Sequence, residues 1–577
     1  MRNSDKSVVD CIAFGDRSDI HSLGDRWHGG SIPSPGRGCI LTRQCNESGY
    51  IETDSKEDWV ALRVYRPGQS SFSPLECTAT VTALILPEHS NIILESLRDA
   101  KMCVKVCTYE YDSRVMTALF ERSLREGVRI EILIEGSPVG GMKNESAQLL
   151  DQLSGKGAKI SVMKSPVSND AIRRYPYLHS KYIVIDNRIS IILSENLIAD
   201  VFDSTLGQGN RGSGVIIDSE EVASYLDAVF RADAYGGFSD TIPWSSAASG
   251  SPNLANSKAE YLLPDRMVPI PSTSTCRIKL LPFPDFSDAI SGIEKLVSSV
   301  ERSLSVELFY ADLTWKTNMK GMVVNPIFSA ITSKMKSLDE FILCLDGSWI
   351  SRTNGGNSEV INALSYNWST RPSEFFIGFQ NASAPFSMIH NKGFVIDHRF
   401  SVVSSINWCF QSACSNRELA VLIDDERIAS FFEDNIRKDI YGDSDPPRIE
   451  PRFSFSRRGD AISLTIAPES DESGLKSVTI TAAGKQVFNW TMEINPERPP
   501  NCVDICAIDL WGNQAELRIV LFPESNDAGI GQSGIGALAS GISIAGISYA
   551  IISSLRSWLK GKGIGKRIRN NPRNKLE

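Results

Sequence analysis

Apolar residues form short continuous runs along much of the chain, and segments with helical spacing separate them. KVCTYEY (105–111) and VRIEILIE (128–135) are runs of the kind that form buried strands. Between them lies SRVMTALFERSLREG (113–127), whose apolar residues recur every three or four positions, as in an amphipathic helix. Strands that alternate with helices in this way predict an α/β fold built from layers.

The same order of elements occurs twice. The second occurrence begins with the helical pattern DAISGIEKLVSSVERS (288–303) and the strand pattern LSVELFY (304–310). Further on, residues 210–233 align without gaps on residues 416–439, and Asn210, Arg211 and Asp233 match Asn416, Arg417 and Asp439. This agreement predicts an internal duplication. Similar domains usually pack about a pseudo-twofold axis, which would bring equivalent strands to one cleft.

A chain of 577 residues is expected to contain several domains. We predict two similar α/β sandwich domains at 75–235 and 272–445, joined by a linker rich in Gly, Ser and Pro at 236–271. Residues 446–523 contain short alternating strand patterns and turn signals, which predict a small β-sandwich. Residues 1–66 contain strand patterns and Gly/Pro turns, which predict a partial β-rich domain.

The C-terminal region differs from the rest in charge. Residues 528–555 contain no charged side chain, and they are long enough to cross a ~30 Å hydrocarbon core, which predicts a transmembrane helix. Residues 556–577 are strongly basic and predict a cytoplasmic tail, with the ectodomain outside the cell. No export signal is apparent at the start, so we expect the natural chain to begin further upstream. The alternatives are a cytosolic tail-anchored protein and a Gly/Ser-rich helix that is either buried or on the surface.

The charge also limits the possible partners. Residues 1–555 carry 52 Lys and Arg against 68 Asp and Glu, a net charge of −16. This balance disfavours nonspecific nucleic-acid binding over a broad surface, while a locally basic cleft stays possible. The twelve cysteines show no zinc-finger spacing. The pairs Cys409/Cys414 and Cys502/Cys506 are candidates for local disulfides, with buried free thiols as the alternative.

Two apolar strands carry polar side chains at identical intervals. YLHSKYIVIDNRISIILSEN (177–196) contains His179, Lys181, Asp186, Ser194 and Asn196. MIHNKGFVIDHRFSVVSSIN (388–407) contains His390, Lys392, Asp397, Ser405 and Asn407. Positions i and i+2 of a strand face the same side, so each histidine shares a face with its lysine. The alternative, two ordinary core histidines, does not explain why the whole arrangement is repeated.

These residue types can act on a phosphodiester without a metal ion. One neutral imidazole attacks phosphorus and forms a phosphohistidine, while the opposing imidazolium protonates the leaving alcohol. Water or a second alcohol then reverses the roles. The charge on phosphorus would be stabilised by a set of phosphate-binding groups, namely Lys181, Lys392, Ser194, Asn196, Ser405 and Asn407. Asp186 and Asp397 belong to the same motif, but five positions beyond each lysine they face away from it, which favours a structural role.

The doubled pattern resembles the signature of the phospholipase D superfamily, His-x-Lys-x4-Asp followed by Gly-Ser-x-Asn, over residues 75–445. The resemblance implies the two-domain fold predicted above, catalysis by both motifs, and no metal or other cofactor. In place of the signature glycine the chain has Leu193 and Ser404, which could tilt the turn that contacts phosphate. Residues 446–523, with GLKSVTITAAG and AIDLWGN, resemble immunoglobulin-like spacers, and residues 1–66 resemble the end of a lamin-tail-like domain.

The resemblance also implies an acid that orients each histidine. Glu418 stands where the family commonly supplies this acid in the second copy, whereas the first copy has Gly212. His179 would then need Asp200, Asp203 or a backbone carbonyl. Arg211 and Arg417 could reach phosphate, but salt bridges are the commoner role of such arginines.

We therefore expect a membrane-anchored phosphodiesterase of the phospholipase D type that hydrolyses or transfers phospholipid head groups. By analogy with duplicated family members, His179 is expected to be the nucleophile. An extracellular nuclease is the alternative, because the superfamily uses the same site on nucleic acids. A third hypothesis is a phosphoester-binding surface protein that has lost turnover. No obligate protein partner is expected.

Overall fold

The computed structural model describes most of the predicted α/β region and parts of the remaining chain. The described residues are 63–164, 173–203, 209–245, 271–286, 292–317, 321–334, 337–348, 356–365 and 372–443, with short stretches between 12 and 59 and between 447 and 520. They fall into two compact units, one ending at Tyr441 and one beginning at Gly442.

The first half of the large unit alternates strands and helices. In chain order it contains β3 (Leu75–Leu86), α1 (Ser90–Arg98), β4 (Cys103–Thr108), α2 (Arg114–Arg125), β5 (Arg129–Glu135), α3 (Asn144–Gly155), β6 (Lys159–Met163), β7 (Tyr182–Ile185), β8 (Ile189–Leu193), α4 (Ala199–Phe202), β9 (Asn210–Asp218), α5 (Glu220–Tyr235) and β10 (Thr241–Pro243). The predicted amphipathic helix is α2. It begins after Ser113, whose hydroxyl accepts a hydrogen bond from the Met116 N–H, and it buries Val115 and Phe120.

The second half follows the same order. It contains β11 (Thr273–Phe283), α6 (Gly292–Ser298), β12 (Ser303–Leu308), β13 (Thr314–Thr317), β14 (Gly321–Val324), α7 (Pro326–Lys334), β15 (Glu340–Leu345), α9 (Gly356–Ser365), β16 (Glu374–Phe379), β17 (Met388–Ile389), β18 (Lys392–Ile396), β19 (Phe400–Ser404), α10 (Phe410–Cys414), β20 (Glu418–Asp424) and α11 (Glu426–Tyr441). Strands β13 and β14 form a separate two-stranded sheet between β12 and α7.

One large sheet runs through both halves, in the order β10-β6-β5-β4-β7-β8-β9-β3-β11-β20-β19-β18-β12-β15-β16. At its centre β3 and β11 pair antiparallel, and from this pair outward the strands follow the same order on both sides. The α/β prediction is confirmed. This sheet joins the two predicted domains into one unit. Each of β3 and β11 is the last strand of its half, and the two strands pair through the backbone groups that would otherwise lie at an open edge. Descent of the halves from an internal duplication stays a prediction.

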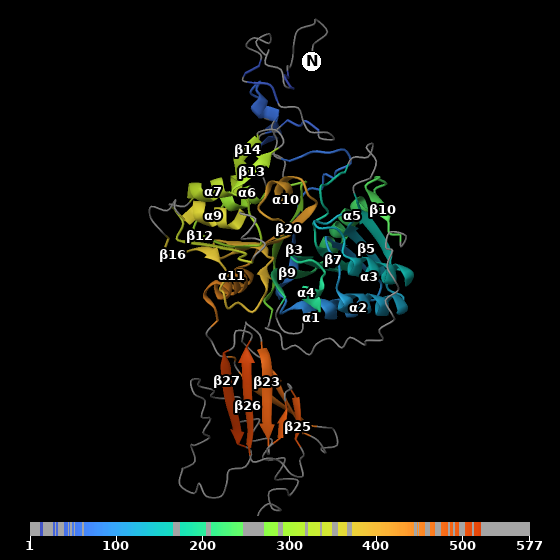
Figure 1. Ribbon diagram of the computed structural model, residues 1–577, viewed down its shortest axis with the longest axis vertical. Helices are drawn as coiled ribbons and strands as arrows, with labels where there is room; N and C mark the ends of the chain where they lie inside the picture. Colours follow the sequence, from blue (N-terminus) through green and yellow to red (C-terminus); the bar gives the residue numbers. More distant parts are fainter. Residues whose placement is uncertain are drawn as a thin grey trace, which may run out of the picture. The chain divides into compact units, whose positions relative to one another are not determined.

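Helices cover both faces of the sheet. On one face α5 and α11 pack over the central strands, where Leu226 and Ile428 share a core with Val81 and Ile278. On the other face α1 to α4 cover the first half, and α6, α7, α9 and α10 cover the second. Figure 1 shows α6, α7 and α9 to the left of β3 and β9, and α2 and α3 to their right. Strands that are buried on both faces must be apolar at nearly every position, as the sequence pattern is.

Two buried arginines connect the halves. The Nε atom of Arg417, directly before β20, lies 2.6 Å from a carboxylate oxygen of Asp233 on α5. The Nε atom of Arg211, on β9, lies 2.8 Å from Asp439 on α11. Each ion pair thus joins a strand of one half to a helix of the other. Both arginines have the structural role that the sequence favoured.

The predicted linker at 236–271 begins too early. Strand β10 pairs antiparallel with β6, with Thr241 opposite Met163, and so extends the first half to residue 243. Asp240, just before β10, accepts a hydrogen bond from the buried Nε of Arg174 at 3.0 Å. Composition missed this strand because an edge strand pairs through its backbone and needs few apolar side chains. Residues 246–270 of the predicted linker lie outside the described part.

The second unit consists of antiparallel strands in two sheets. One sheet has the order β21 (Glu450–Phe455), β22 (Ile462–Ala467), β25 (Thr491–Ile494), and the other has the order β24 (Lys485–Val487), β23 (Leu475–Ala482), β26 (Cys502–Asp509), β27 (Gln514–Val520). Along β26 buried and half-buried residues alternate, so one face of this strand is covered. The relationship to immunoglobulin-like domains stays a prediction.

The two ends of the chain are described only in part. The N-terminal region contains β1 (Cys45–Asn46), β2 (Gly49–Tyr50) and the 3₁₀ helix η2 (Lys56–Trp59), and its lamin-tail-like origin stays a prediction. The predicted transmembrane helix at 528–555 and the basic tail at 556–577 lie outside the described residues. Among the helices that are described, none is both long and apolar enough to cross a bilayer.

The two local disulfides considered from the sequence are not formed. Cys409, Cys414, Cys502 and Cys506 all carry free thiols. Four steps along strand β26 span about 13 Å, well beyond the Cα separation that a disulfide can bridge. All four residues are free thiols, but only Cys414 is buried as the alternative predicted.

Candidate active site

The two histidines lie in short segments before β7 and β18, and the opposite half holds each segment. The His179 N–H donates to the carbonyl of Arg417 at 2.8 Å, and the His390 N–H donates to the carbonyl of Arg211 at 2.7 Å. Strand β17, directly before His390, also pairs with β9 of the first half. These backbone bonds bring both histidines to the boundary between the halves.

Carboxylates at the ends of β5 and β15 hold the residue before each histidine. The Leu178 N–H donates to Glu135 at 2.8 Å, and the Ile389 N–H donates to Asp346 at 2.9 Å. Both acids occupy the same place, at the end of a strand that pairs in parallel with β4 or β12. Neither acid was predicted from the sequence. The available signal was a single acid ending an apolar run in each half, as in ILIE and LCLD.

The ring of each histidine binds a buried carboxylate from the opposite half. Glu418 Oε2 lies 2.8 Å from His179 Nδ1, and Glu195 Oε2 lies 3.0 Å from His390 Nδ1. The histidine side chains are 11% and 12% exposed, while both carboxylates are fully buried. An ionised carboxylate only accepts hydrogen bonds, so Nδ1 carries the proton in each ring. The remaining nitrogen, Nε2, is the reactive atom in both.

This arrangement corrects the predicted acids. Glu418, which belongs to the second copy, binds His179 of the first copy and not His390 of its own copy. Asp203 caps helix α2 by accepting the N–H of Arg114 at 2.7 Å, and Asp200 is exposed on α4, so neither orients His179. The reason is geometric: each histidine segment is hydrogen-bonded to the opposite half.

Glu195, the acid that binds His390, was not predicted. It stands between Ser194 and Asn196, inside the motif itself. An acid at this variable position, together with a glycine where the second copy has Glu418, was the signal that could have identified it.

Both motif lysines are buried beside their histidines. Lys181 Nζ donates to the carbonyl of His179 at 2.6 Å, and Lys392 Nζ donates to the carbonyl of His390. Burial lowers the pKa of Lys181 to about 8 and lowers that of Lys392 well below its ordinary value. A buried ammonium gains most when an anion arrives next to it, because it has lost its water.

The two motifs influence each other electrostatically. Burial lowers the pKa of His179 to about 4, with a further contribution from Lys392 of the other motif. Burial also lowers the pKa of His390, and Lys181 adds to this effect. Both histidines and both lysines therefore lie near the boundary between the halves, close enough to interact electrostatically.

The serine of the second motif has a different role from the predicted one. The Ser405 hydroxyl donates to Glu418 Oε2 at 2.5 Å, and the Asn416 amide donates to Glu418 Oε1 at 3.1 Å. A serine has one O–H donor, so Ser405 supports Glu418 and does not at the same time donate to phosphate. The phosphate contacts of Asn196 and Asn407 stay predictions.

Leu193 and Ser404 replace the signature glycine, and the turn that follows them has the same backbone hydrogen bond in both copies. Leu193 packs over Gly214, where a Cβ atom would lie only 2.6 Å from the leucine side chain. The Ser404 hydroxyl donates to the carbonyl of Lys392 at 2.6 Å. The serine that follows each of them donates its N–H to the neighbouring strand, at 2.9 Å (Ser194) and 3.0 Å (Ser405). Neither substitution tilts this turn.

The motif aspartates lie at the opposite end of their strands from the histidines. Asp186 accepts the N–H groups of Lys101, Met102 and Cys103, at 2.7, 2.7 and 2.9 Å. Asp397 accepts the N–H groups of Glu301, Arg302 and Ser303 in the same way. Both hold the chain where it enters β4 or β12. Their inclusion among the catalytic residues is therefore wrong, and the structural role is the correct one.

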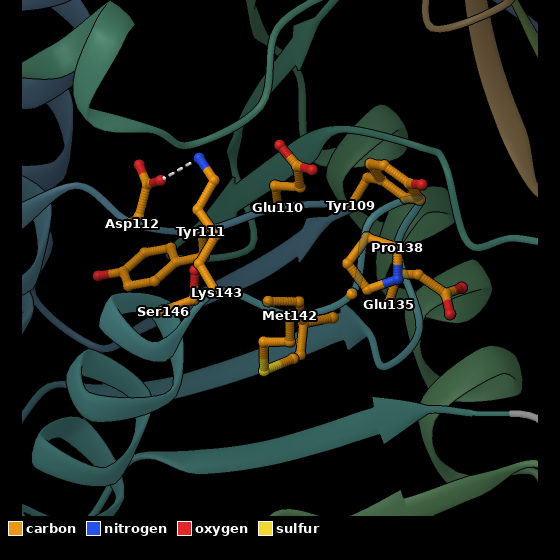
Figure 2. A pocket seen from close by; sticks show the side chains of 11 residues that line it. Tyr109, Glu110, Tyr111, Asp112, Glu135, Pro138, Met142, Lys143 and Ser146 are labelled. Carbon is orange, nitrogen blue, oxygen red and sulfur yellow. Dashed lines mark hydrogen bonds and ion pairs between the residues drawn. The ribbon is translucent and has the colours of Figure 1, made fainter. Parts of the chain in front are cut away.

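A small hollow lined by Tyr109, Glu110 and Lys143 lies near His179, which does not itself line it. The ring of Tyr109 borders it and meets the His179 ring edge-on, with 4.9 Å between the ring centres. Figure 2 shows the carboxylates of Glu110 and Glu135 in its wall and the ion pair of Lys143 with Asp112, which is 2.9 Å long. Burial raises the pKa of Glu110. The hollow has more acidic than basic groups, so it favours a neutral or cationic guest over an anionic one.

Comparison with known families matches both halves. A family model described as a PLD-like domain of cardiolipin synthase matches residues 93–234 and 353–440, which include His179 and His390. Over these segments the chain is similar to PLD-like domains. No curated protein matches the chain.

Several solved structures resemble the chain at low identity. Phosphatidylserine synthase from Haemophilus influenzae is 13% identical, covers 62% of this chain and 86% of its own, and has a TM-score of 0.45. The phospholipase D family member Nuc from Salmonella typhimurium is 16% identical, covers 30% of this chain and 99% of its own, and has a TM-score of 0.24. Polyphosphate kinase from Porphyromonas gingivalis is 10% identical, covers 62% of this chain and 50% of its own, and has a TM-score of 0.37.

Proposed function

We propose that this protein is a metal-independent phosphodiesterase of the phospholipase D type that acts through a phosphohistidine on phospholipid head groups, by hydrolysis or transfer. The observation that carries the proposal is the pair of imidazole–carboxylate contacts, His179 with Glu418 and His390 with Glu195. In both rings Nδ1 is occupied by a buried acid and Nε2 is left for chemistry. Two such rings near the boundary between the halves match what attack and leaving-group protonation require.

In the proposed reaction His179 is the nucleophile. Its Nε2 forms a bond to phosphorus while the bond from phosphorus to the leaving alcohol breaks, and His390, as the imidazolium, gives its Nε2 proton to that alcohol. His390 then takes a proton from water or a second alcohol, whose oxygen bonds to phosphorus as the bond to His179 breaks. Burial lowers the pKa of both rings, and that of His179 falls to about 4, so His179 is neutral and able to attack at physiological pH.

The lysines would stabilise the charge that develops on phosphorus. Lys181 and Lys392 are both buried, and each approaches an aromatic ring, at 5.5 Å from Tyr109 and 5.2 Å from Phe309. In such dry surroundings a positive charge acts on a developing anion more strongly than it does in water. Loss of either ammonium is expected to slow the chemical step.

The hollow near His179 supports a lipid substrate. Its wall carries the carboxylates of Glu110, Asp112 and Glu135. A small neutral or amino alcohol fits such surroundings better than the next phosphate of a nucleic acid does. Together with the predicted membrane helix at 528–555, this favours phospholipid over the alternative, an extracellular nuclease.

The test is turnover by the detergent-solubilised full chain in the presence of EDTA. Phosphatidylcholine, single-stranded DNA and bis-p-nitrophenyl phosphate are offered separately. Lipid turnover supports the proposal, cleavage of DNA alone supports the nuclease, and no turnover of any substrate supports a binding protein. His179→Ala and His390→Ala are each expected to lower the rate by at least about 10³-fold while the thermal unfolding midpoint stays unchanged. Retention of the rate in either variant would contradict the two-histidine mechanism.

The same reagents separate the roles of the histidines. Nitrophenolate leaves without protonation, so His390→Ala should still release one equivalent of nitrophenol from the nitrophenyl ester and accumulate phosphorylated His179. A burst seen with His179→Ala instead would reverse the assignment.

A further inference from the structure

Each half supplies the acid that binds the histidine of the other half, but the two halves carry this acid at different positions. At the end of β8 Leu193 pairs with Gly214, and at the end of β19 Ser404 pairs with Ala420. Gly212 and Glu418 lie two residues before these partners, so they are equivalent. Glu195 and Ile406 are equivalent as well, since each lies two residues after that strand end. The first half thus has an acid at 195 and none at 212, and the second half has the reverse.

In the first half the two positions compete for one space. A Cβ atom at Gly212 would lie 2.4 Å from Cγ of Glu195 and 2.7 Å from its Oε1. Any side chain at position 212 would therefore displace the Glu195 carboxylate from His390. In the second half Ile406 is fully buried in an apolar cluster, and the acid comes from position 418.

The first half has kept the polar residues that would support an acid at position 212. In the second half Ser405 and Asn416 donate to Glu418. Their equivalents, Ser194 and Asn210, are both present and both buried. A glutamate at 212 would find the same two partners.

We propose that Glu195 is the positioning residue of His390, and that positions 195 and 212 form one exchangeable unit in which the acid can occupy either place but not both. The proposal rests on the proposed function wherever activity is the readout. It does not depend on that function where the state of the imidazole is observed directly.

The activity test uses three variants of the full chain. Glu195→Ile, which copies the second half at one position, is expected to lower the rate by about 10²–10⁴-fold, because His390 loses the partner that holds its tautomer. Adding Gly212→Glu to it completes the pattern of the second half and is expected to restore the rate to within about tenfold of the original. Gly212→Glu alone is expected to be impaired, since two acids then occupy one space.

The direct readout is the ¹⁵N spectrum of the chain labelled at its six histidines. The His390 signals are identified by their loss in His390→Ala. In the original chain Nδ1 is expected to be the protonated nitrogen of neutral His390. In Glu195→Ile the two nitrogens should move toward averaged positions, and in the double variant they should return. His179, whose partner Glu418 is untouched, is the internal control and should not change.

The outcomes separate the two proposals. Unchanged rate and unchanged His390 signals in Glu195→Ile overturn the positioning role. A double variant that folds but recovers neither rate nor signals overturns the exchange. If the original chain turns over no phosphodiester while the His390 signals follow the expected pattern, the proposed function fails and the positioning role stands. Should the double variant not fold, Glu195→Gln decides the positioning role, because its amide keeps an acceptor of nearly the same shape and should preserve the tautomer that Glu195→Ile loses.

Discussion

Glu418 and Glu195 perform the same task in the two halves, but their surroundings differ. Glu418 binds His179 and also accepts bonds from Ser405 and Asn416, so both of its oxygens are engaged. Glu195 binds His390, and its Oε1 has no hydrogen-bond partner among the described residues. Burial alone would raise the pKa of Glu418, but His179 and the other donors bring it below the ordinary value.

The difference shows which features the paired topology imposes and which it leaves free. The backbone bonds of both histidine segments to the opposite half follow from the strand order, so they are the same in both halves. The acid only has to place one carboxylate oxygen at Nδ1. A residue on a neighbouring turn can do so as well as a residue on the strand, provided that the strand leaves it room.

The largest difference between the halves is expected in the buried ion pairs that join them. Asp233→Asn leaves the Arg417 guanidinium with Asp285 as its remaining carboxylate and should lower the free energy of unfolding by about 3–5 kcal/mol. Asp439→Asn should cost about half as much. Burial raises the pKa of both carboxyl groups, and the nearby Glu307 adds to this for Asp439, whose pKa lies well above the ordinary value, so a neutral amide resembles the native Asp439 more closely.

Urea titrations followed by tryptophan fluorescence measure both values. Asp218→Asn, which removes the exposed partner of Arg188, is the control and should change the free energy of unfolding by less than about 1 kcal/mol. Equal losses for Asp233→Asn and Asp439→Asn would show that Glu307 does not influence the second pair.

The next effect is the pH dependence, which distinguishes the two histidines. His179 must be neutral to attack, so the rate should rise as pH increases through about 4, its lowered pKa. His390 must be protonated to act as the acid, and burial holds its pKa below the ordinary histidine value of 6.5, so the rate should fall before pH 6.5 is reached. Lys181 loses its proton only near pH 8 and stays charged throughout this window.

The profile of kcat/KM against pH reports these groups in the free enzyme, with limbs that fall about tenfold per pH unit. With the nitrophenyl ester, whose leaving group needs no acid, the alkaline limb of the first step should disappear. An optimum above pH 7 would contradict the assignment of roles.

The smallest effect is expected at the hollow near His179. Glu110 in the first half and Tyr310 in the second occupy equivalent positions, two residues beyond β4 and β12. Glu110→Gln removes a negative charge from the hollow and should raise KM for phosphatidylcholine several-fold with little change in kcat, a loss of about 1 kcal/mol. Tyr310→Phe is the matched control and should leave KM unchanged. A fall in kcat alone would place Glu110 in the chemistry and not in substrate binding.

Local patterns were sufficient to predict much of this protein. The apolar runs and helical spacings identified the alternating elements, and the repeated intervals identified His179, Lys181, His390 and Lys392, because strand periodicity and spacing are properties of neighbouring residues. The same reasoning favoured a structural role for Asp186 and Asp397, since their side chains face away from the lysines.

The identity of each histidine's acid was decided by tertiary structure alone. His179 and Glu418 are 239 residues apart in the chain, and His390 and Glu195 are 195 apart, so no local period relates them. Two further features depend likewise on which strands become neighbours. One is the edge strand β10, and the other is the hydrogen bond from Ser405 to Glu418, which replaces the predicted contact with phosphate. The sequence determined the elements and the reactive residue types, because these follow from local backbone geometry. Only the pairing of the two halves through one sheet determined which side chains face each other, because that choice depends on contacts between distant segments.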